Sequence, residues 1–357
     1  MRLALCRLLF CLTGAAAFSA SPSPARLTHA ERLPGPLLHP GLLPADVGSN
    51  LNGPTMIRVP DWVESPLGRY YLYFAHHDDT HIRLAYADHP EGPFTHFDGG
   101  VLHVDQQTAL WRHIASPDVV IDESSRQLFL FYHGTNPRRD EPGQSRQLTA
   151  VAVSRNGVDF SPLNVIVGPP YLRVFRHQED WYAFNHSGEL RHARRLGEPF
   201  EPIGQLISAD LVTPLDPLLR GEAGAPLPKV AGGPDRQRFG IRHVGFDLHQ
   251  DRLTIFFSCI GHRPERILAT FVRLEGPASS WSATGLEEIL QPELDWEGAD
   301  LPLSFSQPGI ARERRRELRD PHGYREGEQA WLLFSAAGEH AIGMARLHHR
   351  AASQHQP

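Results

Sequence analysis

Cysteine is scarce in this chain of 357 residues, and its scarcity limits how the fold can be stabilised. Two of the three cysteines, Cys6 and Cys11, lie at the extreme N-terminus, and only Cys259 follows. The body of the protein therefore has no internal disulfide, and burial of a hydrophobic core must stabilise it. Cys259 lies in the apolar run 253–260, which predicts a buried, unreactive thiol.

Lysine is rarer still, since Lys229 is the sole example and nearly all basic charge is arginine. The formal net charge is −6, so we expect neither nucleic acid nor an anionic membrane as a partner. In so arginine-rich a chain, a single arginine is weak evidence for a binding site.

Long hydrophobic runs are also absent. The first residues combine Arg2 and Arg7 with a short apolar run, and Ala15 to Ala17 follow as small residues suited to cleavage. We predict that residues 1–20 are a signal peptide and that the mature protein is periplasmic or secreted. Residues 21–48 are rich in Pro, Leu and Ala, and we interpret them as a linker and closing strand.

The sequence does contain a block of short strands and turns that recurs about five times. The clearest copies cover residues 52–58, 70–75 and 82–87, and then residues 116–121, 128–132 and 149–153. Such repeats predict an all-β fold, a single five-bladed β-propeller over residues 49–350. The last copy lacks an outer strand, which we expect the segment around residues 33–48 to supply. Residues 205–240 lack alternation and predict a long connection.

Several strand motifs resemble those of the five-bladed glycosidases around glycoside hydrolase families 43, 32, 117 and 130. The motifs are Tyr70–Ala75, Ile82–Ala87, Ser116-Pro117-Asp118 and Arg319-Asp320-Pro321, and the resemblance covers about residues 50–347. It implies glycosidase activity, with three acids at the starts of the innermost strands of blades one to three. Asp118 matches the acid of blade two. Asn52 stands at the blade-one position, and blade three opens Tyr171-Leu172-Arg173-Val174 without an acid.

Two alternatives follow from that departure: the acids lie on other blades, or the protein does not hydrolyse glycosides. Cleaving an acetal needs a proton donor and a carboxylate that activates water or attacks the sugar. Asp118 and Asp320 are the best candidates, because both occupy strand starts that should face one pocket. His243 occupies the matching place in blade four, and the resemblance to family 117 suggests it as the replacement acid.

Three arginines, Arg173, Arg242 and Arg319, lie at or beside strand starts. Together they would suit a carboxylate, sulfate or phosphate on the ligand, and the alternative is that they neutralise nearby acids. The remaining substrate-binding candidates are Asn52, His133, Trp111 and Glu265. For Glu265 and for Glu339, in the matching turn of blade five, a surface salt bridge is the simpler interpretation.

The histidines at positions 76, 77 and 81 match no common zinc spacing, so we predict no metal site and no cofactor. The leading hypothesis is a secreted glycoside hydrolase-like enzyme that acts on an oligo- or polysaccharide, with an anionic one suggested by the arginines. A glycoside phosphorylase and a non-catalytic carbohydrate-binding propeller are the alternatives.

Overall fold

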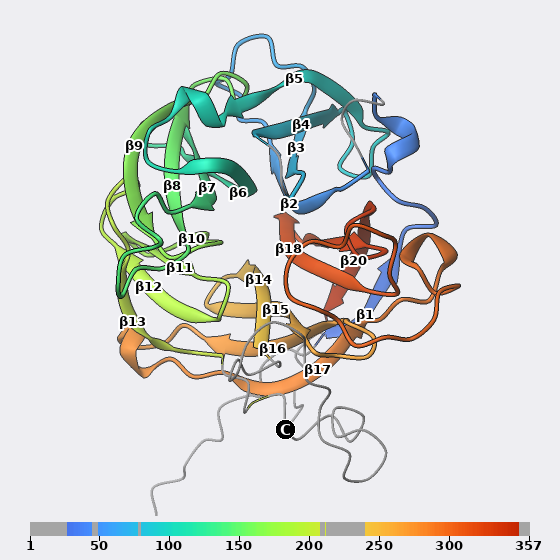
Figure 1. Cartoon of the computed structure of the whole chain (residues 1–357). Helices are drawn as coiled ribbons and strands as arrows, with labels where there is room; N and C mark the ends of the chain where they lie inside the picture. Colours follow the sequence, from blue (N-terminus) through green and yellow to red (C-terminus); the bar gives the residue numbers. More distant parts are fainter. Residues whose placement is uncertain (1–26, 45–48, 78–79, 208–210, 212–239, 350–357) are drawn as a thin grey trace, which may run out of the picture.

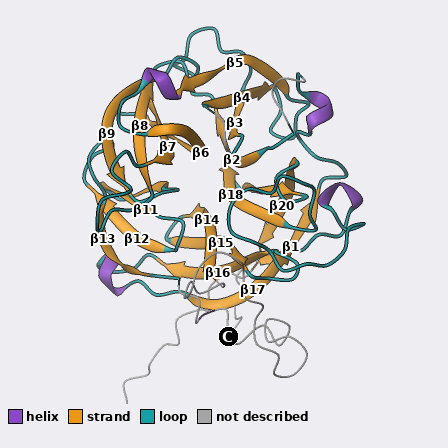
Figure 2. Cartoon of the chain, in the orientation of Figure 1, coloured by secondary structure: helices purple, strands orange, loops and turns teal. Residues whose placement is uncertain are grey.

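The computed structural model describes residues 27–44, 49–77, 80–207, 211 and 240–349. Within these ranges, five four-stranded antiparallel sheets stand in a ring around a central axis (Figure 1). The strands are joined by loops and short 3-10 turns, namely η1 (Pro40–Leu42), η3 (Val104–Gln106), η6 (Ala278–Ser280) and η7 (Asp295–Glu297) (Figure 2). The predicted all-β, five-bladed propeller is confirmed. No helix in the described part of the chain has the length and apolarity to cross a membrane.

Each of the first four blades has its innermost strand first in sequence. Blade one contains β2 (Asn52–Arg58), β3 (Tyr70–Ala75), β4 (His81–Ala87) and β5 (Thr95–His103). Blade two contains β6 (Trp111–Asp122), β7 (Gln127–Thr135), β8 (Gln147–Ser154) and β9 (Ser161–Gly168). Blade three contains β10 (Arg173–His177), β11 (Asp180–Phe184), β12 (Glu189–Ala193) and β13 (Glu201–Gln205). Blade four contains β14 (Gly240–His249), β15 (Arg252–Ile260), β16 (Ile267–Arg273) and β17 (Thr284–Leu290).

Blade five is built from both ends of the described chain. It contains β18 (Leu318–Glu326), β19 (Gln329–Ala336) and β20 (Ala341–His349), and its outer strand is β1 (Leu27–Arg32). An N-terminal segment therefore closes the ring, but its strand lies just before the segment 33–48 that we predicted. Residues 33–38 only continue alongside β20, through the Leu33 and Leu37 N–H groups that donate to Met344 and Ile342 carbonyls.

The blades pack face to face, which explains why their middle strands are apolar on both sides. In β7, Leu128 and Leu130 join the core cluster shared with blade one, whereas Phe129 and Phe131 join the cluster shared with blade three. Side chains alternate across a strand, so one strand supplies two seams. Three further clusters fill the seams of blades three and four, four and five, and five and one. The core is thus a ring of five apolar seams that fixes the inner strands.

Two predictions fall outside the described residues. The signal peptide at residues 1–20 is one, and most of the connection 205–240 is the other.

Candidate active site

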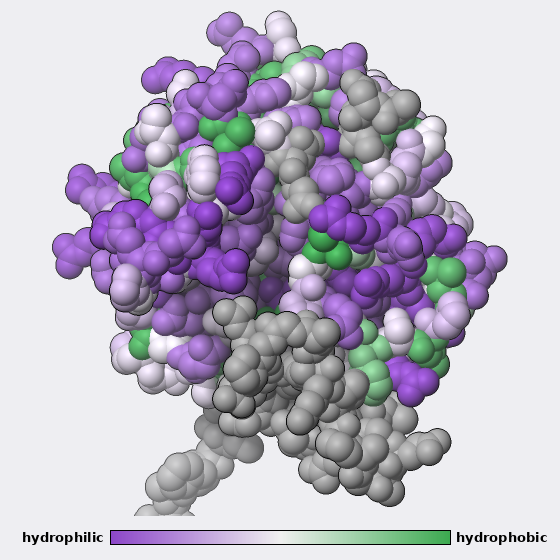
Figure 3. All heavy atoms as spheres, viewed as in Figure 1, coloured by the Kyte–Doolittle hydropathy of each residue, from purple (hydrophilic) through white to green (hydrophobic). Residues whose placement is uncertain are grey.

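The five innermost strands surround the axis of the propeller (Figure 1). Near the starts of four of them the strand register shifts, between Asn52 and Thr55, Ala115 and Asp118, Ile241 and His243, and Arg319 and His322. Such irregularities re-aim side chains beside functional sites. Figure 3 shows hydrophilic residues gathered around the centre of one face of the molecule. The predicted strand-start residues are therefore collected in one buried polar region.

His243 and Asp320 form an ion pair across blades four and five, with Nδ1 of the imidazole against Oδ1 of the carboxylate. The other oxygen, Oδ2, accepts hydrogen bonds from Ser335 Oγ (2.9 Å) and from the Gly53 N–H (3.3 Å). Burial opposes ionisation of Asp320, but His243 and the Arg319 guanidinium group hold the pKa of this carboxyl far below its usual range. Asp320 is therefore an anion that orients the imidazole.

Asp118 links blade two to three other blades. Its Oδ1 lies 3.2 Å from Arg173 Nη1 and accepts a hydrogen bond from Thr55 Oγ1 (3.5 Å). Its Oδ2 accepts the Val174 N–H at 2.8 Å, and His322 Nδ1 lies 3.9 Å from Oδ1. Burial raises the pKa of Asp118, and the Arg173 charge opposes that rise. Both oxygens are occupied by protein groups, so the geometry suits a positioning role.

The other two arginines of the strand starts belong to a buried network of acids. Arg319 donates from Nε to Glu317 Oε2 (2.8 Å) and from Nη1 to Glu339 Oε1 (3.0 Å). Arg242 donates from Nε to Glu265 Oε1 at 2.8 Å, while Glu265 Oε2 lies 3.5 Å from Arg319 Nε. All three glutamates are fully buried. Our prediction of surface salt bridges for Glu265 and Glu339 is therefore wrong, because both side chains are buried.

The three arginines are not available as an anion-binding cluster, because each is paired with protein carboxylates. They are outnumbered by the five buried acids around them: Asp118, Glu265, Glu317, Asp320 and Glu339. In the structure these arginines thus pair with neighbouring acids, as the alternative interpretation expected.

Tyr171 lies among three histidines next to the His243–Asp320 pair. Its ring centroid is 3.9 Å from that of His133, 4.3 Å from that of His243 and 5.7 Å from that of His186. The residue holds a left-handed backbone conformation with φ of +61°, which is uncommon for an aromatic residue. Burial lowers the pKa of His133 well below its usual value and that of His186 to about 4. These two imidazoles are neutral at physiological pH.

Several buried polar atoms of this region have no hydrogen-bond partner among the residues that the structure describes. They include Asn52 Oδ1, His133 Nδ1 and His243 Nε2, on residues that are 3 %, 2 % and 8 % exposed. Buried polar groups in native proteins are nearly always paired with protein, water or ligand. Water or a polar ligand would therefore complete the hydrogen bonding of these atoms.

Trp111 is the one predicted binding residue that lies on the surface, with 46 % of it exposed at the start of β6. The guanidinium carbons of Arg112 and Arg139 lie 4.2 and 4.8 Å from its ring centroid. The ring is therefore already in contact with two cations.

The described residues contain no group of three or more His, Cys, Asp or Glu side chains arranged to hold a metal ion. His77, from the histidine-containing turn of blade one, bonds through Nδ1 to Glu339 Oε1 at 3.2 Å. Burial opposes ionisation of Glu339, but His77 and Arg319 lower its pKa to about 2. Residues 78–79 of the same turn lie outside the described part.

Several residues of this site were given no role from the sequence, among them Tyr171, His186 and His322. Tyr171 and His322 do have a detectable signal, because both stand within two residues of strand-start positions already singled out. His186 lies after β11 and has no such signal, and only the fold brings its ring toward Tyr171.

No protein-family model matches the sequence. An uncharacterised protein of Acanthamoeba polyphaga mimivirus is 28% identical over 316 residues, which cover 84% of this chain and 83% of that protein.

Solved structures resemble the chain more clearly in fold than in sequence. A family-43 β-xylosidase/α-arabinofuranosidase from a compost microbial metagenome, in complex with xylotriose, matches with a TM-score of 0.55 and 11% identity over 92% of this chain and 96% of its own. A GH43_1 enzyme from Xanthomonas citri matches with a TM-score of 0.55 and 14% identity over 89% and 91% of the two chains. A thermostable family-43 glycoside hydrolase matches with a TM-score of 0.56 and 11% identity over 86% of this chain and 95% of its own. The chain therefore has the five-bladed fold of these enzymes and is divergent in sequence.

Proposed function

We propose that this protein is a glycosidase-like enzyme that cleaves a neutral oligo- or polysaccharide at the axis of the propeller. The observation that carries the proposal is the unpaired set Asn52 Oδ1, His133 Nδ1 and His243 Nε2 beside an ionised carboxylate. Sugar hydroxyl groups both donate and accept hydrogen bonds, so they can satisfy acceptors and imidazole nitrogens together. The fold shared with family-43 enzymes, one of them in complex with xylotriose, supports a saccharide as ligand.

In this proposal His243 transfers the proton. Asp320 holds Nδ1 of the ring, and Nε2–H of the imidazolium donates its proton to the glycosidic oxygen as the bond between that oxygen and the sugar carbon breaks. Water then adds to the sugar carbon and gives a proton back to Nε2. The carboxylate fixes the orientation of the ring, and its negative charge stabilises the imidazolium of this ion pair. Asp118 contributes by holding Arg173 and the start of β10, rather than by direct proton transfer.

The charge balance favours a neutral ligand over an anionic one. The buried carboxylates outnumber the strand-start guanidinium groups, and each of those groups already has a protein partner. A phosphate or uronate group brought here would meet carboxylates and no unpaired arginine. Phosphorolysis, which needs a bound phosphate, is disfavoured for the same reason.

A non-catalytic saccharide-binding propeller is the second candidate. It is favoured because protein groups already bind the oxygens of both carboxylates. Asp118 is held by Arg173, Thr55 and Val174, and Asp320 is held by His243 and its neighbours. Such carboxylates lack an oxygen free to attack a sugar carbon. Binding would then use the same unpaired atoms without turnover.

A turnover assay decides between the two candidates. The protein is incubated with a panel of neutral oligosaccharides that includes xylotriose, and products are separated by chromatography. His243→Ala and Asp320→Asn should each lower kcat at least 100-fold. His249→Ala, at a partly exposed histidine at the other end of β14, is the matched control and should keep full activity. Saccharide binding without turnover by the wild type would establish the binding-module alternative, and activity that survives His243→Ala would refute the assignment of the proton donor.

We also propose that the protein works outside the cytoplasm, as the N-terminal sequence indicates. Expression of the full chain in a bacterial host, followed by N-terminal sequencing of the periplasmic protein, tests this. A mature end near residue 21 supports it, whereas an intact Met1 in a cytoplasmic product contradicts it.

A further inference from the structure

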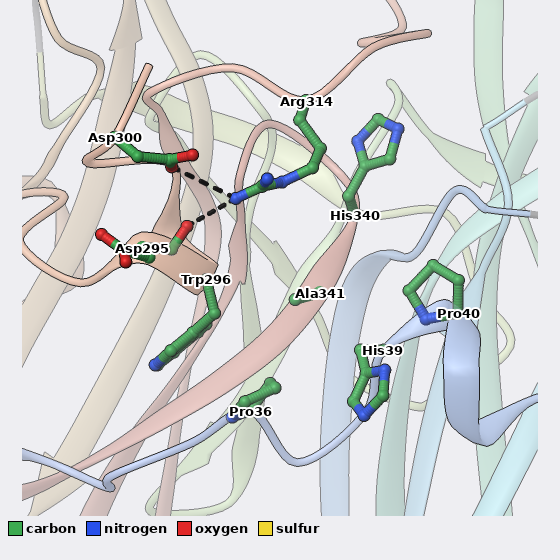
Figure 4. A pocket seen from close by; sticks show the side chains of 9 residues that line it. All are labelled: Pro36, His39, Pro40, Asp295, Trp296, Asp300, Arg314, His340 and Ala341. Carbon is green, nitrogen blue, oxygen red and sulfur yellow. Dashed lines mark hydrogen bonds and ion pairs between the residues drawn. The ribbon is translucent and has the colours of Figure 1, made fainter.

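A pocket of about 490 Å³ lies beside blade five (Figure 4), and it shares no lining residue with the site at the axis of the propeller. Four separate segments of the chain contribute to its wall, and its lining comprises Pro36, His39, Pro40, Asp295, Trp296, Asp300, Arg314, His340 and Ala341. Its volume falls within the range of about 300–1,000 Å³ that is usual for small-ligand pockets. From this arrangement we infer a second saccharide-binding site, for one unit of a neutral sugar chain. The inference rests on the proposed function for the class of ligand.

The apolar part of the wall suits the face of a sugar ring. Trp296, Pro36, Pro40 and Ala341 line the pocket together (Figure 4). The Trp296 ring is supported from the core, since it stacks on Phe334 with 6.2 Å between centroids and 17° between planes. An aromatic side chain anchored in this way offers a rigid apolar surface at little cost in conformational entropy.

The polar part of the wall excludes an anion. Arg314, the one arginine of the lining, bonds through Nη2 to Asp300 Oδ1 (3.3 Å) and to the carbonyl oxygen of Asp295. Burial lowers the pKa of His340, so this imidazole is neutral at physiological pH. The carboxylates of Asp295 and Asp300 therefore leave the wall slightly negative, with acceptors suited to hydroxyl donors.

The position of the pocket relates it to the central site. The turn between β19 and β20 carries Glu339 and His340 in succession. Glu339 bonds inward to Arg319 and His77, whereas His340 lines the pocket. This turn lies at the end of blade five where β18 begins, because adjacent strands are antiparallel. One polysaccharide chain could thus occupy both sites on the same side of the molecule.

The test uses xylotriose, maltotriose and cellotriose as probes and the ¹⁵N-labelled full-length protein. The indole N–H resonance of Trp296 is assigned with Trp296→Phe and followed by NMR during each titration. We expect a saturable shift with at least one trisaccharide, in the wild type and also in Asp320→Asn. The double variant Asp300→Ala/Arg314→Ala removes two half-exposed side chains and should weaken the apparent affinity at least tenfold. Arg195→Ala, which removes an exposed arginine of a similar pair in blade three, should bind like the wild type.

The outcomes separate this inference from the proposed function. A shift of Trp296 without turnover of any saccharide supports the pocket and refutes the activity. Turnover by the wild type with no shift of Trp296 refutes the pocket and leaves the activity intact. If the double variant binds as tightly as the wild type, or if no probe is bound anywhere, the pocket is not a saccharide site.

Discussion

Gly53 of blade one lies against the backbone of Ser116 of blade two, so closely that a Cβ on Gly53 would come within 2.7 Å of Ser116 Cα. The same glycine has a left-handed backbone with φ of +57°, and its N–H donates to Asp320 of blade five. A single residue without a side chain thus holds three blades in register at the site. The fixed position of Asp320, and through it of His243, depends on this close approach.

Gly53→Ala should therefore lower both stability and activity. The left-handed backbone alone costs a non-glycine residue about 1 kcal/mol, and the clash with backbone atoms should bring the loss in unfolding free energy to about 2–4 kcal/mol. Gly327→Ala is the matched control, since Gly327 has φ of +58° with open space around it. Urea unfolding of the two variants isolates the steric contribution. Equal losses of unfolding free energy in both variants would show that Gly53 and Ser116 can move apart at little energetic cost.

The fold was predictable because its signal is local and repeated. Each blade repeats alternating apolar strands and turns, and five copies leave little freedom of architecture. The closing strand was placed too late in the chain, because β1 (Leu27–Arg32) is a short outer strand with polar residues and no distinctive pattern. Its identity is fixed by pairing with β20, a contact that spans almost the whole sequence.

The candidate site was predictable only in part. Strand-start positions pointed to Asp118, His243 and Asp320, because a propeller brings those positions together. The partners of the arginines could not be predicted in this way. Glu317 precedes β18 and Glu339 lies in a turn, where acids are usually solvated, and only tertiary packing buries them against Arg319. The pocket of blade five is less visible still, since its wall joins residues about 300 positions apart.

Stability should fall as the pH is lowered from about 6.5 toward 4, in part because of His186. Burial lowers the pKa of this imidazole from 6.5 to about 4, so in that range the unfolded chain binds a proton that the folded protein does not. The stabilisation is complete above pH 6.5 and declines below it. Since the ring keeps some contact with solvent, we expect this residue to account for about 1–2 kcal/mol between pH 7.5 and pH 5.

The measurement is urea unfolding at pH 7.5 and pH 5 for the wild type, His186→Gln and a control at a partly exposed histidine, His249→Gln. His186→Gln should flatten the pH dependence, and His249→Gln should leave it unchanged. A pH dependence as steep in His186→Gln as in the wild type would show that other groups account for it.

Arg319 should be among the residues least tolerant of substitution. Arg319→Leu leaves Glu317, Glu339 and Glu265 buried without a shared cation, which should cost about 3–5 kcal/mol of unfolding free energy. Adding Glu317→Gln removes one of the uncompensated charges and should recover part of the loss. Thermal unfolding of both single variants and of the double variant tests this coupling. Strictly additive losses would contradict the shared network, and Arg195→Ala, an exposed pair, should change the midpoint little.

The last prediction concerns Asn52, which occupies the strand start where the family resemblance implies an acid. Asn52→Asp would bury a second carboxylate near Asp320, because the neighbouring Gly53 N–H already reaches Asp320 Oδ2. Burial and the like charge should raise the pKa of the new carboxyl above its unfolded value. The destabilisation should therefore be small at pH 4 and grow as the pH rises through that pKa, to about 1–3 kcal/mol at pH 8.

Turnover by Asn52→Asp should also fall, since in the proposed mechanism the amide binds the substrate and His243 transfers the proton. Asn164→Asp places the same charge on the exposed strand β9 and should change neither stability nor activity. The measurements are melting temperatures from pH 4 to 8 and kcat on the best substrate of the panel. A rise in kcat would mean that an acid at position 52 takes part in catalysis. The assignment of proton transfer to the His243–Asp320 pair would then be wrong.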